Sequence, residues 1–117
     1  MNIEQYRDYC IDKKGVTDSF PFDEKTLVFK VMNKMFAHTS IEEFNFVNLK
    51  CNPEKSIELR DENDGIIGAY HMSKKHWNSV STTGHVSEKQ IYQLIDHSYD
   101  LVTGSLTKQA QKELEEL

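Results

Sequence analysis

The chain has 117 residues, and its formal net charge at pH 7 is −5 because 19 Asp and Glu outnumber 14 Lys and Arg. A chain of this length is expected to form one domain with a modest core. Nucleic-acid-binding proteins are usually basic, so this acidic balance argues against an obvious member of that class. The chain also has no apolar run long enough to span a bilayer, so no membrane partner is expected.

The two cysteines, Cys10 and Cys51, are far apart in the sequence and have no metal-like spacing. The start of the chain does not resemble a signal peptide. We therefore expect a cytoplasmic protein in which both thiols stay reduced and are buried as small hydrophobic side chains.

Hydrophobic periodicity and breaker residues divide the chain into helices and strands. The expected elements are, in order, a helix at 2–14, an extended loop at 18–23, strands at 26–31, 35–40 and 44–51, a helix from 53 to about 63, strands at 66–72 and 76–83, and a helix from 88 to 104. Residues 108–117 are polar and are expected to form a frayed or weakly helical C-terminal tail. Residues 1–107 are then the single folded domain.

Three local signals set the boundaries of these elements. Pro21 disfavours helix at the residue before it, so this region is expected to be extended. Asn52 can cap the free amides of a helix that begins with Pro53. Ser87 and Gln90 form the sequence pattern of a capping box at the start of the last long helix.

The order α-β-β-β-α-β-β-α has strand connections that are mostly too short for parallel crossovers. The sequence therefore predicts an α+β fold with two layers, in which the helices cover one face of an antiparallel sheet. The expected helices are acidic, whereas residues 66–87 hold two lysines and no carboxylate. Positive charge is therefore expected on the strands and at the ends of the hairpins.

The segment 68–80 concentrates donor-rich side chains, because it holds two lysines, two histidines and the only tryptophan, with no acid. Lys74, Lys75 and His76 lie at the expected end of the second hairpin, where lysines can bind phosphate or simply keep a sheet edge solvated. Trp77 either packs in the core or stacks on a base.

Three further lysines and one asparagine widen this candidate site. Lys30, Lys34 and Lys50 extend the positive patch if their strands neighbour the second hairpin. Asn78 can donate to a base edge or accept from it. The candidate DNA-binding residues are therefore Lys30, Lys34, Lys50, Lys74, Lys75, His76, Trp77 and Asn78.

The sequence shows no motif of a known enzyme class. It lacks a phosphate-binding glycine loop, a nucleophile elbow and the zinc motif His-Glu-x-x-His. His71 and His76 are five residues apart across a turn, which can bring two imidazoles together, but no third zinc ligand is nearby. We therefore expect no catalytic residue, no bound metal and no cofactor. An enzyme acting on a small anion would need a deep pocket lined by His71, His76 and Lys50.

One motif runs Gly68-Ala-Tyr-His-Met72 and continues as Lys74-Lys-His-Trp-Asn78, and a second is Asn48-Leu-Lys-Cys-Asn-Pro53. Both resemble the central signature of the MmcQ/YjbR-like family. Further matches at 26–31, 34–37 and 96–102 extend the resemblance over residues 15–107. The resemblance implies an α+β domain similar to secretion-chaperone-like and frataxin-like folds. It also implies a double wing of two hairpins, at 30–37 and 70–80, that binds DNA.

The resemblance and the charge pattern together predict a non-enzymatic DNA-binding protein that contacts phosphates through two basic hairpins, with weak sequence specificity. The alternative is a protein-interaction or chaperone-like module that binds no nucleic acid, which the negative net charge also suits. An exposed apolar sheet face would favour that alternative.

Overall fold

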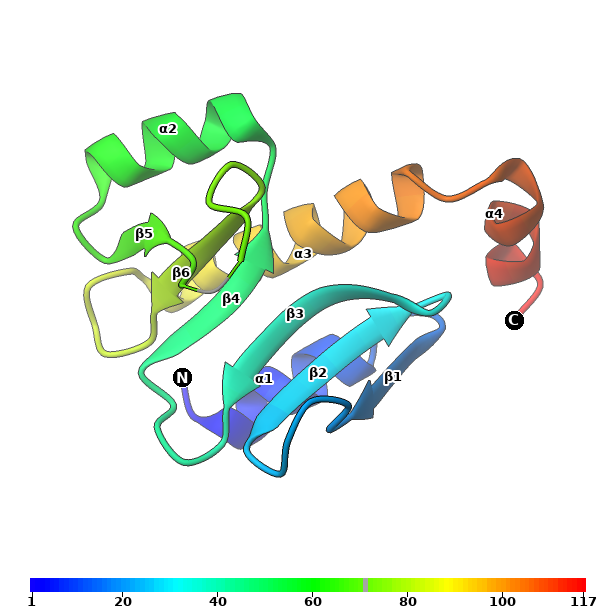
Figure 1. The fold of residues 1–117 in the computed structure, drawn as a ribbon, viewed down its shortest axis with the longest axis horizontal. Helices are drawn as coiled ribbons and strands as arrows, with labels where there is room; N and C mark the ends of the chain where they lie inside the picture. The colour runs from blue at the N-terminus through cyan, green and yellow to red at the C-terminus, as the bar shows by residue number, and fades with distance from the viewer. Residues whose placement is uncertain (71) are drawn as a thin grey trace.

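The computed structural model describes residues 1–70 and 72–117, which form a sheet with helices around it (Figure 1). The elements are, in chain order, α1 (Ile3–Ile11), β1 (Val16–Ser19), β2 (Thr26–Val31), β3 (Lys34–Ser40), β4 (Phe46–Lys50), α2 (Pro53–Glu62), β5 (Ile66–Gly68), β6 (Trp77–Ser81), α3 (Glu88–Gly104) and α4 (Lys108–Glu115). Within this part of the chain, no helix combines the length and the apolar character needed to cross a membrane.

The described strands form one six-stranded sheet in the order β1-β2-β3-β4-β6-β5, and neighbouring strands are antiparallel throughout. The first four strands follow the order of the chain because their connections are short. Helix α2 then carries the chain past β6 to the edge of the sheet, where β5 lies beside β6. This arrangement confirms the predicted α+β fold with an antiparallel sheet.

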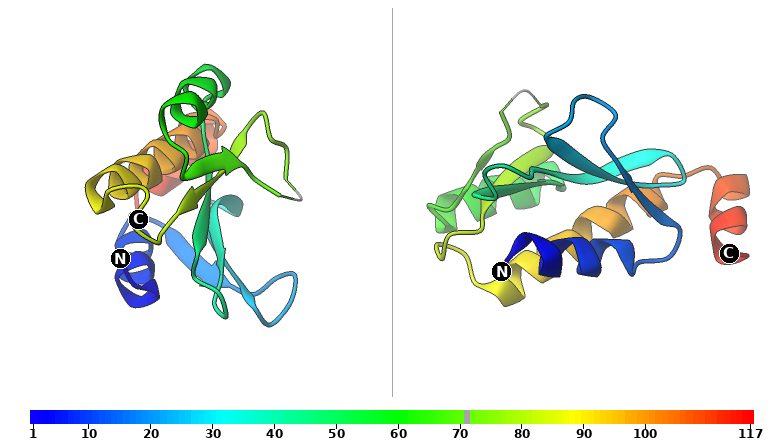
Figure 2. Two further views of the ribbon diagram at one scale, coloured as in Figure 1. Left: turned by 90° about the vertical axis from the view of Figure 1, so that its left-hand side faces the viewer. Right: turned by 90° about the horizontal axis from the view of Figure 1, so that it is seen from below.

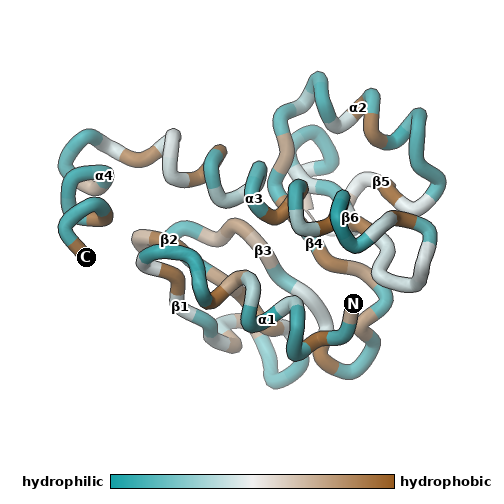
Figure 3. The backbone as a smooth tube through the Cα atoms, turned by 180° about the vertical axis from the view of Figure 1, so that it is seen from behind, coloured by the Kyte–Doolittle hydropathy of each residue, from teal (hydrophilic) through white to brown (hydrophobic). Residues whose placement is uncertain are grey.

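Helices α1 and α3 lie side by side on one face of the sheet, as the view from below shows (Figure 2). Their buried side chains pack against inward-facing strand residues in one core. Tyr6 of α1 meets Phe29 of β2 edge to face, with ring centroids 5.4 Å apart. In Figure 3 several strand segments are brown, whereas α2 and α4 are mostly teal, as expected for helices at the periphery of the core.

The predicted start signals of α2 and α3 are confirmed. The side chain of Asn52 accepts hydrogen bonds from two backbone amides of the first turn, at 3.0 and 3.3 Å, and Pro53 is the first residue of α2. The hydroxyl of Ser87 accepts a hydrogen bond from the backbone amide of Gln90 at 3.1 Å. Both caps satisfy amides that have no partner within their helix.

The β2–β3 hairpin turns through only two residues, Met32 and Asn33, whose φ angles of 48° and 65° are both left-handed. Two successive left-handed residues are typical of a type I′ turn, whose twist matches that of the strands it joins. Strand β3 therefore begins at Lys34, one residue earlier than predicted. A register shift between Phe29 and Lys30 marks a β-bulge in the same hairpin.

Strand β1 differs from the sequence prediction, which placed an extended loop at 18–23. Residues Val16–Ser19 instead pair with β2, and the connecting loop comprises residues 20–25. A strand of four residues at the edge of a sheet is too short to show a clear alternation of apolar and polar residues. The sequence therefore gave no sign of it.

The C-terminal segment was expected to be a frayed or weakly helical tail, and residues 108–115 form a regular helix, α4. Leu114 of this helix is buried against the turn between α1 and β1. Gly15 in that turn has a φ of +74°, and a Cβ atom placed on it would come within 2.5 Å of Leu114 Cδ1. Lys14 Nζ also donates to the carbonyl oxygen of Glu115 at 2.7 Å. These contacts hold α4 against the sheet domain.

Candidate functional site

The face of the sheet opposite α1 and α3 carries no helix among the described elements, and we call it the open face (Figure 2). Paired residues of neighbouring strands point to the same face. Because Phe29, Val31, Val47 and Val80 belong to the core, the alternate residues of the sheet point to the open face. The open-face residues are Thr17, Ser19, Thr26, Val28, Lys30, Met35, His38, Ser40, Phe46, Asn48, Lys50, Ile67, Trp77, Ser79 and Ser81.

None of these open-face residues is acidic, and two of them are lysines. Lys30 pairs with Met35 and Lys50 pairs with Trp77, which puts both lysines toward the end of the sheet where the β2–β3 turn lies and β6 begins. The loop at 69–76 is at the same end because it joins β5 to β6. We call this part of the molecule the lysine end of the sheet. Lys30 and Lys50 reach it on the open face, whereas Lys74 and Lys75 lie beside α2 and line a hollow of about 320 Å³ with Arg60.

The acidic residues near the open face lie at its opposite end. The loops at 20–25 and 41–45 join strands there, and they contain Asp23, Glu24, Glu42 and Glu43. Glu42 forms an ion pair with Lys25 at 3.4 Å. Backbone amides donate to Asp23 and lower the pKa of its carboxyl group. The charges of the open face are therefore separated along the strands.

Two of the predicted DNA-binding residues point to the other side of the sheet. Lys34 pairs with Val31, whose side chain is in the core, so Lys34 points toward the helix side although it is exposed. Asn78 is 2% exposed; its Oδ1 accepts from Arg60 Nε at 2.8 Å, and its Nδ2 donates to Ser56 Oγ at 3.2 Å. The amide is occupied inside the protein, which corrects the prediction that Asn78 meets a base edge.

Trp77 is on the open face but is only 8% exposed, which favours its interpretation as a packing residue. Arg60 of α2 was not predicted as a site residue. It holds the chain before and after Trp77 in place. The Arg60 guanidinium donates to the carbonyl oxygens of Lys74 and Trp77 as well as to the Asn78 side chain. A basic residue in the last turn of a helix is common for electrostatic reasons alone, so the sequence held no signal for this role.

The basic side chains of the loop before β6 are exposed. Lys74 Nζ donates to the carbonyl oxygen of Ala69 at 3.5 Å and lies 5.8 Å from the centroid of the Tyr70 ring. Lys75 and His76 are also exposed. Among the residues that the structure describes, none of the five predicted lysines forms an ion pair with a carboxylate. Their charges are therefore not neutralised by direct contact.

His38 lies on the open face but adds no charge to it at neutral pH, because burial lowers its pKa to about 4. Its ring packs beside Trp77, with centroids 5.6 Å apart. Asn48 Nδ2 lies 3.3 Å from His38 Nδ1, and Asn48 Oδ1 accepts from Ser79 Oγ at 2.5 Å. These contacts fix the orientation of the Asn48 amide. The other ring nitrogen of His38, Nε2, is buried without a hydrogen-bond partner in the described part of the chain.

The open face is hollowed in two neighbouring places. A hollow of about 280 Å³, called the open-face hollow below, is lined by Ser40, Glu43, Asn45, Phe46, Asn48, Tyr70 and Ser79. A second hollow, of about 330 Å³, shares Phe46 and extends over Ile67 toward His85. Phe46, Ile67 and Tyr70 are 40%, 51% and 76% exposed. This surface therefore combines lysines at one end with exposed apolar side chains.

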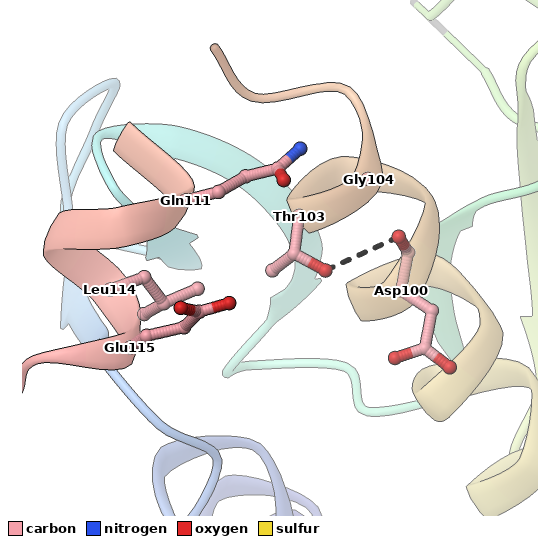
Figure 4. A pocket seen from close by; sticks show the side chains of 6 residues that line it. All are labelled: Asp100, Thr103, Gly104, Gln111, Leu114 and Glu115. Carbon is pink, nitrogen blue, oxygen red and sulfur yellow. Dashed lines mark hydrogen bonds between the residues drawn. The ribbon is translucent and has the colours of Figure 1, made fainter. Parts of the chain in front are cut away.

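Another hollow, of about 370 Å³, lies away from the sheet, between the end of α3 and α4 (Figure 4). It is lined by Asp100, Thr103, Gly104, Gln111, Leu114 and Glu115. Two carboxylates and no cation among these residues make it unsuitable for an anionic ligand. The hollow beside α2, lined by Arg60, Lys74 and Lys75 with no carboxylate, suits such a ligand better.

The described residues include no group of three or more His, Cys, Asp or Glu side chains that could hold a metal ion. His71, which could meet His76 across the turn, lies outside the described residues. Cys10 and Cys51 are both free and buried, as predicted.

The family model of YjbR matches residues 11–101. The uncharacterized protein YjbR of Escherichia coli strain K12 is 32% identical over 118 residues, which covers the whole of both chains. The uncharacterized protein YbdF of Escherichia coli O157:H7 is 38% identical over 94 residues, which is 80% of this chain and 77% of the relative. The resemblance to the MmcQ/YjbR-like family is thus confirmed.

Solved structures share the fold. The crystal structure of a Deinococcus radiodurans protein superposes with a TM-score of 0.92 at 36% identity, covering 97% of this chain and 88% of that one. The crystal structure of a Pseudomonas syringae protein gives a TM-score of 0.73 at 30% identity, covering 86% and 98%. Since the sequence and fold comparisons agree over most of the length, the chain belongs to the YjbR family.

Proposed function

We propose that this protein binds DNA through the lysine end of its sheet. One observation carries the proposal. Lys30 and Lys50 on the strands, and Lys74 and Lys75 in the loop before β6, belong to the same end of the sheet, and none is paired with a described carboxylate. Ammonium groups on flexible side chains bind phosphates as point charges.

Binding through phosphates gives affinity that depends steeply on salt. With about four phosphate contacts, the log–log slope of affinity against salt is expected to be near −3.6. Sequence specificity on duplex DNA is expected to be weak, because phosphate contacts carry no sequence information. The buried amide of Asn78 is consistent with this expectation.

We propose a binding role in the cytoplasm, without catalysis. Burial raises the pKa of the Cys10 thiol to about 12, and Cys51 is 3% exposed. A buried thiol is a poor nucleophile. The His38 ring is packed beside Trp77, so it is poorly placed to exchange protons with a substrate.

Fluorescence anisotropy with a labelled DNA duplex tests the proposal. Affinity should fall about 100-fold between roughly 50 and 200 mM salt. A Lys74→Ala, Lys75→Ala variant should bind more weakly, with a slope that is smaller by about two. The matched control is Lys108→Ala, Lys112→Ala, which removes two exposed lysines of α4. Equal weakening in both variants, or unchanged binding in the first, would contradict a site at the lysine end.

A protein-interaction role is the second candidate, and one observation favours it. Phe46, Ile67 and Tyr70 expose apolar surface on or beside the open face. Exposed apolar patches on soluble proteins often mark contacts with other proteins. Capture of a partner that survives nuclease treatment, and that is lost in Ile67→Ser but kept in Lys74→Ala, Lys75→Ala, would favour this role over DNA binding.

A further inference from the structure

The open-face hollow offers a nucleic acid more than phosphate contacts. Two aromatic side chains, Phe46 and Tyr70, line it and are 40% and 76% exposed. We infer that this hollow receives one unpaired base of a single-stranded nucleic acid, an inference that rests on the proposed nucleic-acid binding. Its volume of about 280 Å³ lies just below the roughly 300–1,000 Å³ of small-molecule sites, which suits a single planar ring system.

The aromatic side chains supply stacking surface from two separate elements. Phe46 begins β4 and pairs with Ser81, whereas Tyr70 lies in the loop after β5. A ring that enters the hollow therefore contacts both. Every nucleobase has a π face that stacks on aromatic side chains, so this contact tolerates any sequence.

The polar lining of the hollow suits a base and not a phosphate. The Glu43 carboxylate repels phosphate, but it accepts hydrogen bonds from the amino and imino N–H groups of a base. Asn48 also lines the hollow, and its contacts with Ser79 and His38 fix its amide. The second hydrogen of that amide is left for an acceptor on the base.

Two lysines stand where the phosphate of such a nucleotide would lie. Lys50 is two residues from Asn48 on the same face of β4, roughly 7 Å along the strand. Lys74 Nζ is 5.8 Å from the centroid of the Tyr70 ring that lines the hollow. The charges therefore orient the nucleotide, with its base toward the β3–β4 loop and its phosphate toward the lysine end.

The hollow favours a single strand over a duplex. A paired base must be unstacked and unpaired before it can enter, and this costs free energy that an unpaired base does not require. The net charge of −5 limits the general attraction to either form. Stacking in the hollow therefore decides the preference, which we expect to be at least about tenfold for the single strand.

Anisotropy titrations with a labelled 12-nucleotide DNA, the same sequence as a duplex, and its RNA equivalent test this inference. Phe46→Ala and Tyr70→Ala should each weaken single-strand binding by about 5- to 100-fold and change duplex binding little. Tyr70→Phe keeps the ring and should retain affinity. The matched control is Phe22→Ala, because Phe22 is 67% exposed in the loop at 20–25 and does not line the hollow. The inference is supported if the DNA or the RNA strand binds tightly and loses affinity in Phe46→Ala and Tyr70→Ala but not in Tyr70→Phe or Phe22→Ala. The strand that binds more tightly then shows whether the base comes from DNA or from RNA.

The outcomes separate this inference from the proposed function. Equal affinity for strand and duplex, with Phe46→Ala and Tyr70→Ala unchanged and Lys74→Ala, Lys75→Ala weakened, would overturn the base site and leave phosphate binding intact. A loss in Phe22→Ala equal to that in Phe46→Ala would also overturn it, because the contact would then be a diffuse apolar surface. No binding of any of the three nucleic acids would remove the proposed function itself.

Discussion

The hydroxyl of Ser98 on α3 accepts a hydrogen bond from the backbone amide of Lys50 at 2.9 Å. The same hydroxyl donates to the carbonyl oxygen of Phe36 at 2.5 Å. The β3–β4 ladder contains only the pairs Ala37↔Leu49 and His38↔Asn48, so Ser98 bridges the two strands just beyond the last direct pair. The helix layer thus fixes the end of β4 that carries one lysine of the proposed site.

Replacing Ser98 by Ala should destabilise the fold. The substitution leaves the Lys50 amide and the Phe36 carbonyl buried without their partner, at a cost of about 1–3 kcal/mol in the free energy of unfolding. Urea denaturation followed by circular dichroism measures it. Ser105→Ala serves as the control because Ser105 is exposed at the end of α3. Equal losses of unfolding free energy in the two variants would show that the Ser98 bridge stabilises the fold no more than an exposed serine does.

Two glycines should respond to alanine in opposite directions. Gly15→Ala puts a Cβ within 2.5 Å of Leu114 Cδ1 at a φ of +74°, so it should cost about 1–3 kcal/mol and loosen α4. Gly104 in α3 has no atom near the position of a Cβ, and Gly104→Ala should stabilise the protein by up to about 1 kcal/mol. Thermal unfolding of both variants checks the signs. A stabilising Gly15→Ala would mean that α4 does not pack on this turn.

Removing the Arg60 side chain should loosen the loop before β6. Arg60→Ala deletes the hydrogen bonds to the Lys74 and Trp77 carbonyl oxygens and to Asn78, so amides near Trp77 should exchange faster with solvent. DNA affinity should fall several-fold, because Lys74 and Lys75 would no longer be held in place. Hydrogen exchange and anisotropy measure the two effects. Lys55→Ala on the same helix is the control, and equal exchange rates in both variants would contradict this role.

Acid should destabilise the protein partly through His38. Its pKa is about 4 when folded and near 6.5 when unfolded, so the unfolded state binds more protons between these values. The free energy of unfolding therefore falls as the pH drops from about 6.5 to 4, by roughly 3 kcal/mol at most from this group. Urea titrations across this range should show a shallower fall for His38→Gln. The exposed His85→Gln is the control, and identical profiles for the two variants would argue against a buried neutral His38.

Signals carried by a few consecutive residues were enough to predict much of the fold. Asn52-Pro53 and Ser87 mark the starts of α2 and α3 because a cap depends only on the first turn of a helix. The first hairpin followed from alternation on either side of a short connection. The second was predicted as strands at 66–72 and 76–83, whereas β5 ends at Gly68 and β6 begins only at Trp77. The four-residue β1 was not predicted, and α4 was expected only as a frayed or weakly helical tail, because each is fixed by contacts with distant parts of the chain.

The candidate site was harder to predict than the fold, because the face of a strand residue depends on register. Lys34 follows a two-residue turn and Asn78 pairs with Leu49, so both point away from Lys30 and Lys50. A shift of one residue would reverse those faces, and the sequence does not set the register that closely.

The residues that organise the site from behind were not predicted either. Ser98 is 48 residues from its partner Lys50 in the sequence, and Arg60 is 18 residues from Asn78. No local pattern connects such pairs, so only the folded chain reveals them.

The most direct test of nucleic-acid binding at the lysine end is the salt dependence of affinity for Lys30→Ala, Lys50→Ala. Anisotropy titrations at several salt concentrations give its log–log slope beside those of the unaltered protein and of Lys108→Ala, Lys112→Ala. We expect the slope to become less negative by about two in the first variant and to stay unchanged in the second. Identical slopes in all three proteins would contradict phosphate binding by the open face.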